Sequence, residues 1–254
     1  MDYKTECPYY ENNCDLTTCA CPKYKAWEYT KNASNVKQTI EQLGVDFHQE
    51  NWKIIMEMQK KFSVKFRPVE NQTKDEKDEW INKYLICIED EIGELRDMLN
   101  IDGLIWEKPF EVEEAKKEVI DILHFVMDTI ISYGVSVNEI KQWYFRRYCD
   151  NIIDVKDFLN FTHDITVKKP LTQSDVFIKI NNMSKACREV RQHISWKHWK
   201  RKNEKIDHEK MMNALVFLMK CYFDLAYQFM NDKEMVDIYI KKNVENIARA
   251  NFGY

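Results

Sequence analysis

The stretch EAKKEVIDILHFVMD, residues 114–128, has the spacing of an amphipathic α-helix and carries two acids, Glu118 and Asp121, within its apolar run. Positions three apart differ by about 60° around a helix axis, so both carboxylates project from one face. Carboxylates buried among so many apolar neighbours are usually paired, protonated or bound to a metal. The stretch therefore predicts a helix that holds two functional acids.

A second acidic pair lies in the stretch CIEDEIGELRDML, residues 87–99, where Glu91 and Glu94 have the same three-residue spacing. Two such helices packed face to face would bring four carboxylates together. Carboxylate oxygens are the ligands that magnesium prefers. The two stretches together predict a magnesium site, although a solvated, acid-rich helix is the better explanation of the Glu91 pair taken alone.

The composition favours an all-α protein. The 254 residues include only 5 glycines and 5 prolines, and 31% of them are charged, which fits amphipathic helices joined by short connections. The net charge of -4 and the isoelectric point near 5.9 give no general attraction to nucleic acid. No apolar run reaches the roughly 18 residues of a membrane span, and the N-terminus lacks the apolar core of a signal peptide. We therefore expect a soluble, cytoplasmic protein that binds neither membranes nor nucleic acid.

Residues 1–33 are predicted to form a separate, irregular N-terminal extension, ahead of one helical domain at residues 34–254. Four cysteines crowd into the extension: Cys7, Cys14, Cys19 and Cys21. In a reducing compartment, four thiolates can hold a structural zinc ion. Their spacing, C-x6-C-x4-C-x-C, differs from the paired C-x2-C motifs of common zinc modules. An accessory tail with free thiols is therefore the alternative.

Apolar periodicity predicts a first helix that begins near Ser34 or Asn35, either of which would serve as its N-cap, and a second apolar run at residues 51–66. A solvated connector rich in Lys, Glu and Asp is expected from Pro68 to Glu79. Beyond it, further helices are predicted in two series of three: 80–99, 112–133 and 137–152, then 174–194, 208–230 and 232–250.

The two series match each other when the chain is shifted by 95 residues against itself. Identical residues then coincide in three successive helices: Glu94 and Glu189, Leu123 and Leu218, Tyr144 and Tyr239. Three acids of the first series have no acidic counterpart: Glu91, Glu118 and Asp121 face Ala186, Asn213 and Val216. We therefore predict two helical repeats, at about residues 80–152 and 174–250, of which only the first kept the metal-binding acids.

The pattern E-x-x-E, 23 residues, then E-x-x-D resembles the motif of the all-α nucleotide pyrophosphohydrolases, the superfamily of MazG and the dimeric dUTPases. Three further segments resemble the branch of dimeric dUTPases and dCTPase-dUTPases: EMQKKFSVKF at 57–66, EVIDILHF at 118–125 and YIKKNVENIARANFGY at 239–254. Together they cover roughly residues 51–254 and leave the N-terminal extension unmatched. The resemblance implies a bundle of two MazG-like repeats.

The resemblance also implies a magnesium-dependent dUTP diphosphatase, which hydrolyses dUTP to dUMP and pyrophosphate with two or more magnesium ions. It further implies attack on the β-phosphorus, hence dUDP as a second substrate, and a homodimeric assembly. Glu91 is expected to orient or deprotonate the attacking water, and Glu94, Glu118 and Asp121 to bind the metal. A dCTPase or a broader dNTP pyrophosphohydrolase is the alternative within the family.

Substrate-binding residues are predicted on two other helices. Lys242, Asn246 and Arg249 share one face of the last helix, at steps of four and three. A lysine and an arginine there would donate charge-assisted hydrogen bonds to phosphate, and an asparagine would bind sugar or base. An exposed basic helix is the alternative. Gln59, in the segment that resembles the family's first helix, would read the pyrimidine edge, but a single glutamine does not distinguish uracil from cytosine.

The run WKHWK at residues 196–200 resembles the W-K-x-W-K motif of dimeric dUTPases, but here it follows Glu189, in the repeat without acids. Packing or a basic surface patch explains it equally well. Two other functional classes are weaker. A di-iron carboxylate bundle needs Glu-x-x-His on two helices, and the chain offers only Asp121-x-x-His124. A non-catalytic scaffold would leave the acids and the terminal motif unexplained.

Overall fold

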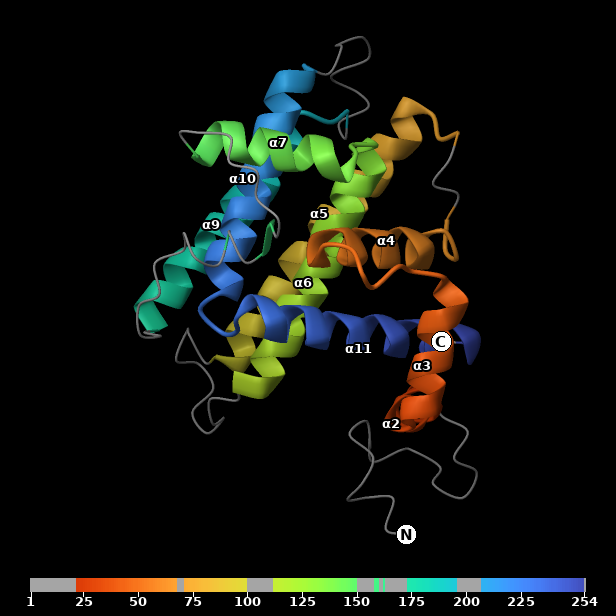
Figure 1. The fold of residues 1–254 in the computed structure, drawn as a ribbon. Helices are drawn as coiled ribbons and strands as arrows, with labels where there is room; N and C mark the ends of the chain where they lie inside the picture. The colour runs from red at the N-terminus through yellow and green to blue at the C-terminus, as the bar shows by residue number, and fades with distance from the viewer. Residues whose placement is uncertain are drawn as a thin grey trace.

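The computed structural model of the chain describes residues 22–67, 71–99, 112–149, 158–159, 162, 173–195 and 207–253. These residues form nine α-helices and include no strand, which confirms the predicted all-α fold (Figure 1). In chain order the helices are α2 (Pro22–Lys31), α3 (Ala33–Leu43), α4 (Asn51–Ser63), α5 (Lys74–Met98), α6 (Val112–Tyr133), α7 (Val137–Tyr148), α9 (Gln173–Gln192), α10 (His208–Ala226) and α11 (Asp232–Asn251).

Helix α6 is the centre of the bundle. It packs against α4, α5, α10 and α11, and most of its side chains are buried. Each fully buried Leu, Ile or Val contributes roughly 1.5–3 kcal/mol relative to an exposed one. The helix ends at Gly134, whose left-handed φ of 88° a residue with a side chain would rarely adopt, and whose N–H bonds to the carbonyls of Ile130 and Ile131.

Two helix pairs form the body of the molecule. α5 packs along α6, and α9 along α10, and the helices of each pair run in opposite directions (Figure 1). An aromatic cluster fastens α4, α7 and α10 together, with ring centroids 5.2–6.1 Å apart. Its members are Trp52, Tyr144, Phe158 and Phe223, all nearly or completely buried. These contacts supply both apolar burial and the tilted ring geometry that aromatic pairs prefer.

The helix order is compatible with the predicted two-repeat arrangement. The pair α5–α6 is followed by α7, and the pair α9–α10 by α11. Helices α7 and α11 begin at Val137 and Asp232, which are 95 residues apart, and are capped by Ser136 and Asn231. The duplication itself stays a prediction.

The predicted irregular structure of residues 1–33 is wrong for its last part. Residues Pro22–Lys31 form α2, which packs against α11 and buries Ala26 completely. A proline at the first helical position has a backbone angle suited to that place, and the tertiary contact stabilises the short helix. The next helix begins at Ala33 rather than at Ser34 or Asn35, because the side chain of Asn32 accepts a hydrogen bond from the Ser34 amide.

The predicted connector from Pro68 to Glu79 is also too long. Helix α5 begins at Lys74, where Thr73 and Glu76 form a capping box in which each side chain bonds the other's backbone amide. Helix α7 ends at Tyr148, before the predicted residue 152. The proposed zinc ligands Cys7, Cys14, Cys19 and Cys21, and the run Trp196–Lys200, lie outside the described residues.

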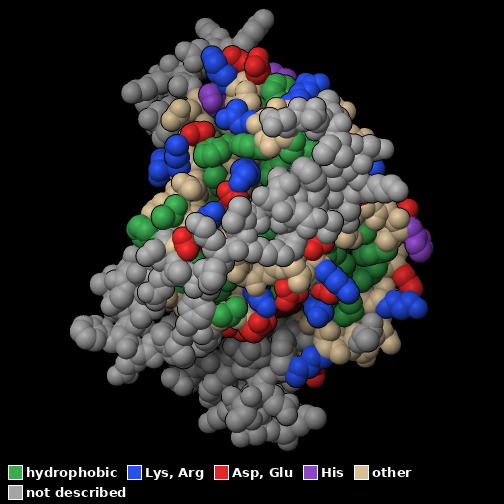
Figure 2. Space-filling view, turned by 60° about the vertical axis from the view of Figure 1, so that its left-hand side comes forward, with side chains coloured by type: hydrophobic (Ala, Val, Ile, Leu, Met, Phe, Trp, Pro, Cys, Tyr) green, Lys and Arg blue, Asp and Glu red, His purple; other side chains and the backbone are tan. Residues whose placement is uncertain are grey.

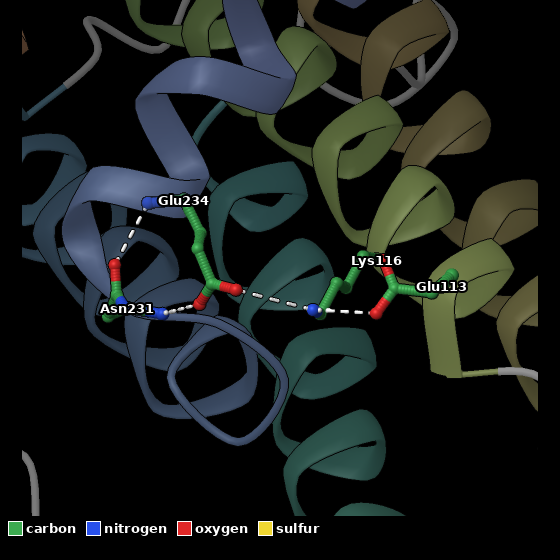
Figure 3. A network of polar contacts seen from close by, with 4 residues as sticks. All are labelled: Glu113, Lys116, Asn231 and Glu234. Carbon is green, nitrogen blue, oxygen red and sulfur yellow. Dashed lines mark hydrogen bonds and ion pairs between the residues drawn. The ribbon is translucent and has the colours of Figure 1, made fainter.

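Helix α11 crosses α6 and is held at both ends (Figure 1). At its start, Lys116 of α6 binds Glu113 at 2.8 Å and Glu234 of α11 at 3.4 Å (Figure 3). Glu234 also closes the capping box of α11, because its carboxylate accepts from the Asn231 amide while the Asn231 side chain accepts from the Glu234 amide. At its other end, α11 packs against α2 and α3. This fixes α11 relative to the acid-bearing part of α6.

The surface shows charges of both signs side by side on the face seen in Figure 2, especially in its lower half. Exposed large hydrophobic side chains occur on α5 and α9 and just after α4, at Ile86, Ile178 and Phe66. Among the described helices, none alone is long and apolar enough to cross a membrane. Only α6 and α7 taken together satisfy that criterion, and they are bent by 105° relative to each other.

Replacing Asn231 by alanine should remove the cap of α11 and reduce the free energy of unfolding by about 1 kcal/mol, measured by urea denaturation. Asn231→Asp should retain most of the stability, because aspartate caps equally well. Equal losses in the two variants would show that the side-chain cap does not stabilise α11.

Candidate metal centre

Three carboxylates converge where α5 packs against α6. Glu91 comes from α5, Glu118 and Asp121 come from α6, and one oxygen of each lies within 4.8 Å of the other two. The three-residue step along α6 puts both of its acids on the same face. Glu118 is only 9% exposed. The structure thus brings together three of the four acids that the sequence singled out.

The cluster is poorly solvated, and this changes its protonation. Burial raises the pKa of Glu91 to about 8, with further increases from the charge of Asp121 and from a hydrogen bond and charge of Glu118. Burial, and then the charge of Asp121, also raise the pKa of Glu118, while the hydrogen bond with Glu91 lowers it. Burial and the repulsion between neighbouring carboxylates therefore favour the protonated form of Glu91 when no cation is bound.

The fourth acid, Glu94, lies one turn further along α5, and its side chain is exposed. It is not within the group of three converging carboxylates. Its charge nevertheless adds a smaller increase to the pKa values of Glu91 and Glu118, behind the effect of burial. Glu94 therefore lies at the solvent side of the cluster.

A lysine of α11 forms an ion pair with the acid cluster. Lys242 Nζ lies 2.7 Å from Asp121 Oδ2, and both side chains are 16% exposed. Burial raises the pKa of Asp121 more than the neighbouring Lys242 and Arg249 lower it. Burial lowers the pKa of Lys242, but the ion pair with Asp121 outweighs this, so that its pKa is raised and its ammonium group stays charged. The acids and the predicted phosphate-binding lysine therefore belong to one site.

Comparison with family models gives a dUTPase family that matches residues 51–186, which is more than half of the chain. The chain belongs to the all-α dUTPase family. Comparisons with curated proteins and with solved structures gave no match. The matched segment contains all four acids and Gln59, but it ends before α10 and α11. The family match therefore does not cover Lys242 or Arg249. The fold brings these two cations of α11 to the acid cluster.

The other two predicted residues of α11 lie further along the helix. Arg249 Nη2 binds Glu245 Oε1 at 2.5 Å, and both side chains are largely buried. The charge of Arg249 reaches the cluster, because it contributes to lowering the pKa of Asp121, although burial dominates there. Asn246 is half-buried. Lys242 and Arg249 thus form a cationic edge beside the acids of this member of the dUTPase family.

Gln59 is at the centre of a buried polar network rather than at an open surface. It is fully buried, and its Nε2 donates to Asp128 Oδ2 at 2.8 Å. Its Oε1 accepts from the Tyr239 hydroxyl at 2.7 Å and lies 2.7 Å from His124 Nδ1. Because Asp128 takes the amide N–H, the oxygen must face His124, so that Nδ1 carries the proton. The network joins α4, α6 and α11.

His124 lies three residues after Asp121 but contributes no ligand atom to the acid group. Burial, aided by Lys242, lowers its pKa to about 3, so the ring is neutral. Its Nε2 is then a buried acceptor, and it has no hydrogen-bond partner among the described residues. Within that same part of the chain, the di-iron alternative therefore lacks a histidine ligand at the cluster.

Asn243 and Asp128 were missed at the sequence level. Asn243 is fully buried next to Lys242, and neither its amide nitrogen nor its amide oxygen has a partner at hydrogen-bond geometry among the described residues, although the Tyr239 hydroxyl is nearby. Burial raises the pKa of Asp128 to about 6, against the effect of hydrogen bonds from Ser63 and Gln59. The sequence did carry a signal for Asp128, because this acid stands in an otherwise apolar stretch of α6.

The stability of the metal-free protein should report on the raised pKa of Glu91. The pKa of Glu91 in the folded protein, about 8, lies above its ordinary value of 4.5, so the stability associated with its protonated form is lost as the pH rises between these values. In excess EDTA, the melting temperature of the wild type should therefore fall relative to that of Glu91→Gln from pH 5 to pH 8. Millimolar Mg²⁺ should restore the wild type at high pH.

The comparison is internally controlled, because buried His124 is present in both proteins and its pH effect cancels. Circular dichroism melts over this pH range give the measurement. Parallel curves for the two proteins in EDTA would show that Glu91 does not hold a proton in the folded cluster.

Proposed function

We propose that this dUTPase-family protein is a magnesium-dependent dUTP diphosphatase, which hydrolyses dUTP to dUMP and pyrophosphate. Family membership supports a nucleotide diphosphatase in general. The single observation that supports the metal-dependent reaction is the convergence of Glu91, Glu118 and Asp121, with Lys242 beside them. Such an arrangement provides ligands for a cation and a donor for phosphate oxygens at one place.

The donor set fits magnesium. All three converging groups are carboxylates, and no histidine or cysteine joins them within the described residues. Glu94, Glu118 and Asp121 are proposed to hold the ions, of which the family resemblance implies two or more. Bound magnesium would neutralise phosphate charge and lower the pKa of a bound water.

The protein groups have distinct proposed roles. Burial raises the pKa of Glu91 to about 8 in the metal-free cluster, and we propose that in the working site its carboxylate orients or deprotonates the attacking water. Asp121 is paired with Lys242 in the described state. A metal bound to Asp121 would replace this partner, and Lys242 would then donate to a phosphate oxygen. Arg249 would do the same from two turns further along α11.

The nucleoside is proposed to lie toward α4 and the α11 face that carries Asn246. A direct contact between the base and Gln59 would require the amide to exchange one of its present partners. Attack on the β-phosphorus and use of dUDP follow from the family resemblance, as does a homodimer. A dCTPase or a broader dNTP pyrophosphohydrolase is the alternative. Pyrophosphate release from the eight common nucleotides decides between these substrates.

Neutralising one acid of α6 should abolish this activity. Glu118→Gln or Asp121→Asn should reduce kcat for dUTP by at least about a thousand-fold, because each removes a charged ligand from the site. Glu189→Gln is the matched control. Glu189 occupies the position of Glu94 in the predicted second repeat, and its side chain is 39% exposed and pairs with Lys185. The positions that correspond to the other three acids hold Ala186, Asn213 and Val216.

The control variant should retain wild-type kcat, and all three proteins should give the helical circular dichroism of the wild type. Full activity of Glu118→Gln, or activity in excess chelator, would exclude the proposed centre. Equal inactivation of Glu189→Gln would exclude the division of labour between the repeats.

Arg249→Ala should lower kcat/KM for dUTP by about 30- to 150-fold, which corresponds to about 2–3 kcal/mol of lost transition-state binding. Arg249→Lys should recover part of this loss, because it retains the charge but not the planar fork. Steady-state kinetics at saturating Mg²⁺ give the measurement. Unchanged kcat/KM in Arg249→Ala would make the residue a purely structural partner of Glu245.

A further inference from the structure

A pocket of about 620 Å³ lies beside α4. It is bounded by α4, the start of α5 and the turn between α6 and α7. Its volume is in the range of small-molecule sites, roughly 300–1,000 Å³. Apolar side chains line part of it, namely Met56, Ile131 and Val135, each less than a tenth exposed.

Three lysines line the same pocket, Lys53 and Lys60 from α4 and Lys77 from α5. The side-chain ammonium group of none of them has a hydrogen bond or an ion pair with the part of the chain that the structure describes. Lys53 and Lys77 are half-buried, and the Lys77 amine lies over the turn at Gly134, 3.7 Å from where a Cβ would be. The half-buried Lys53 and Lys77, without a side-chain partner beside an apolar floor, favour an anionic ligand, and the exposed Lys60 adds positive charge at the rim.

The acid in the pocket wall does not neutralise these lysines. Glu57 already binds Lys61 at 3.1 Å and accepts a hydrogen bond from Gln49 at 2.7 Å. The pocket therefore has an excess of positive charge.

Backbone donors at the start of α7 add to this preference. The pocket is lined by Ser136, Val137 and Asn138. The Ser136 side chain satisfies the amide of Glu139, and its carbonyl that of Ile140. The amides of Val137 and Asn138 belong to the first helical turn, which has no intrahelical acceptors. Such amides favour anions, and both residues line the same cavity as the lysines.

The pocket is separate from the acid cluster. Asp121 and Val135 are 14 residues apart on and just beyond α6, which corresponds to about 20 Å along a helix. Helix α4 crosses α6 between these two places (Figure 1), since its Gln59 bonds Asp128. A ligand in the pocket would therefore not occupy the site of hydrolysis.

We propose that this pocket binds a phosphorylated small molecule. The phosphate meets Lys53, Lys60 and Lys77 and the free amides of α7, while the organic part covers the apolar floor around Met56 and Ile131. The inference stands on the pocket alone and does not depend on the proposed dUTP hydrolysis.

Residue-resolved amine labelling tests the proposal. The full-length wild type is acetylated in excess EDTA, with and without inorganic phosphate or dUMP as the probe, and the labelling rate of each lysine is read by mass spectrometry. At a probe concentration ten times its Kd, Lys53, Lys60 and Lys77 should react about tenfold more slowly, because about a tenth of the pockets remain empty. Three exposed lysines outside the pocket should be unaffected: Lys25, Lys65 and Lys233.

Lys242 reports the acid cluster in the same experiment, so binding at the two places is distinguished. Equal protection by phosphate and dUMP would assign the pocket to the phosphate group alone, and tighter protection by dUMP would show that the apolar floor contributes. Absence of selective protection by either probe would overturn the proposal. Protection that grows with protein concentration without a probe would assign the surface to self-association and would also overturn it.

A charge-matched pair of variants provides the second measurement. Replacing Lys53, Lys60 and Lys77 together by glutamine should abolish calorimetric binding of phosphate at the pocket, whereas replacing Lys25, Lys65 and Lys233 should not. Both variants lose three positive charges, and both should keep wild-type helical circular dichroism. Equal binding by the two variants would overturn the proposal.

Discussion

Crowding of carboxylates in a poorly solvated helix interface is the constraint on which the rest of this structure depends. Glu91, Glu118 and Asp121 cannot all be ionised within 4.8 Å of one another without compensation. The charge is compensated in two ways, by the raised pKa of Glu91, which favours its neutral form, and by the ammonium group of Lys242 on Asp121. The second compensation requires α11, from the far end of the described chain, to cross α6 at this place. Both can be displaced by a divalent cation, which makes the same interface suited to binding one.

The buried network around Gln59 shows how the remaining polar groups are accommodated. The amide of Gln59 is satisfied from α6 through Asp128 and His124, and from α11 through Tyr239. Leaving one such buried group without its partner would cost about 1–3 kcal/mol, and this cost stabilises the relative position of the three helices. The glutamine thereby fixes α4 against both helices of the acid site, whatever it does with a base.

Local features were predictable, and partners distant in sequence were not. The helix α6 was expected from its amphipathic spacing and its end from Gly134, and the spacing of Glu118 and Asp121 fixes their common face. The ion pair between Asp121 and Lys242 joins residues far apart in the chain, and helical periodicity does not specify which faces meet. For the same reason, the sequence pattern around Asn243 does not predict that this side chain is buried. Helix α2 was missed because its stability comes from contact with α11 and not from its own composition.

The packing of α2 and α3 on α11 has a consequence for how the molecule can be divided. The family match spans residues 51–186, yet the helix that completes the acid site lies after it, and the helices that cover that helix lie before it. The two flanks meet each other in space, with the rings of Tyr29 and Phe252 only 6.1 Å apart. The limits of family similarity are therefore not the limits of a folding unit. An expression fragment cut at those limits would keep every acid and lose the parts that neutralise and enclose them.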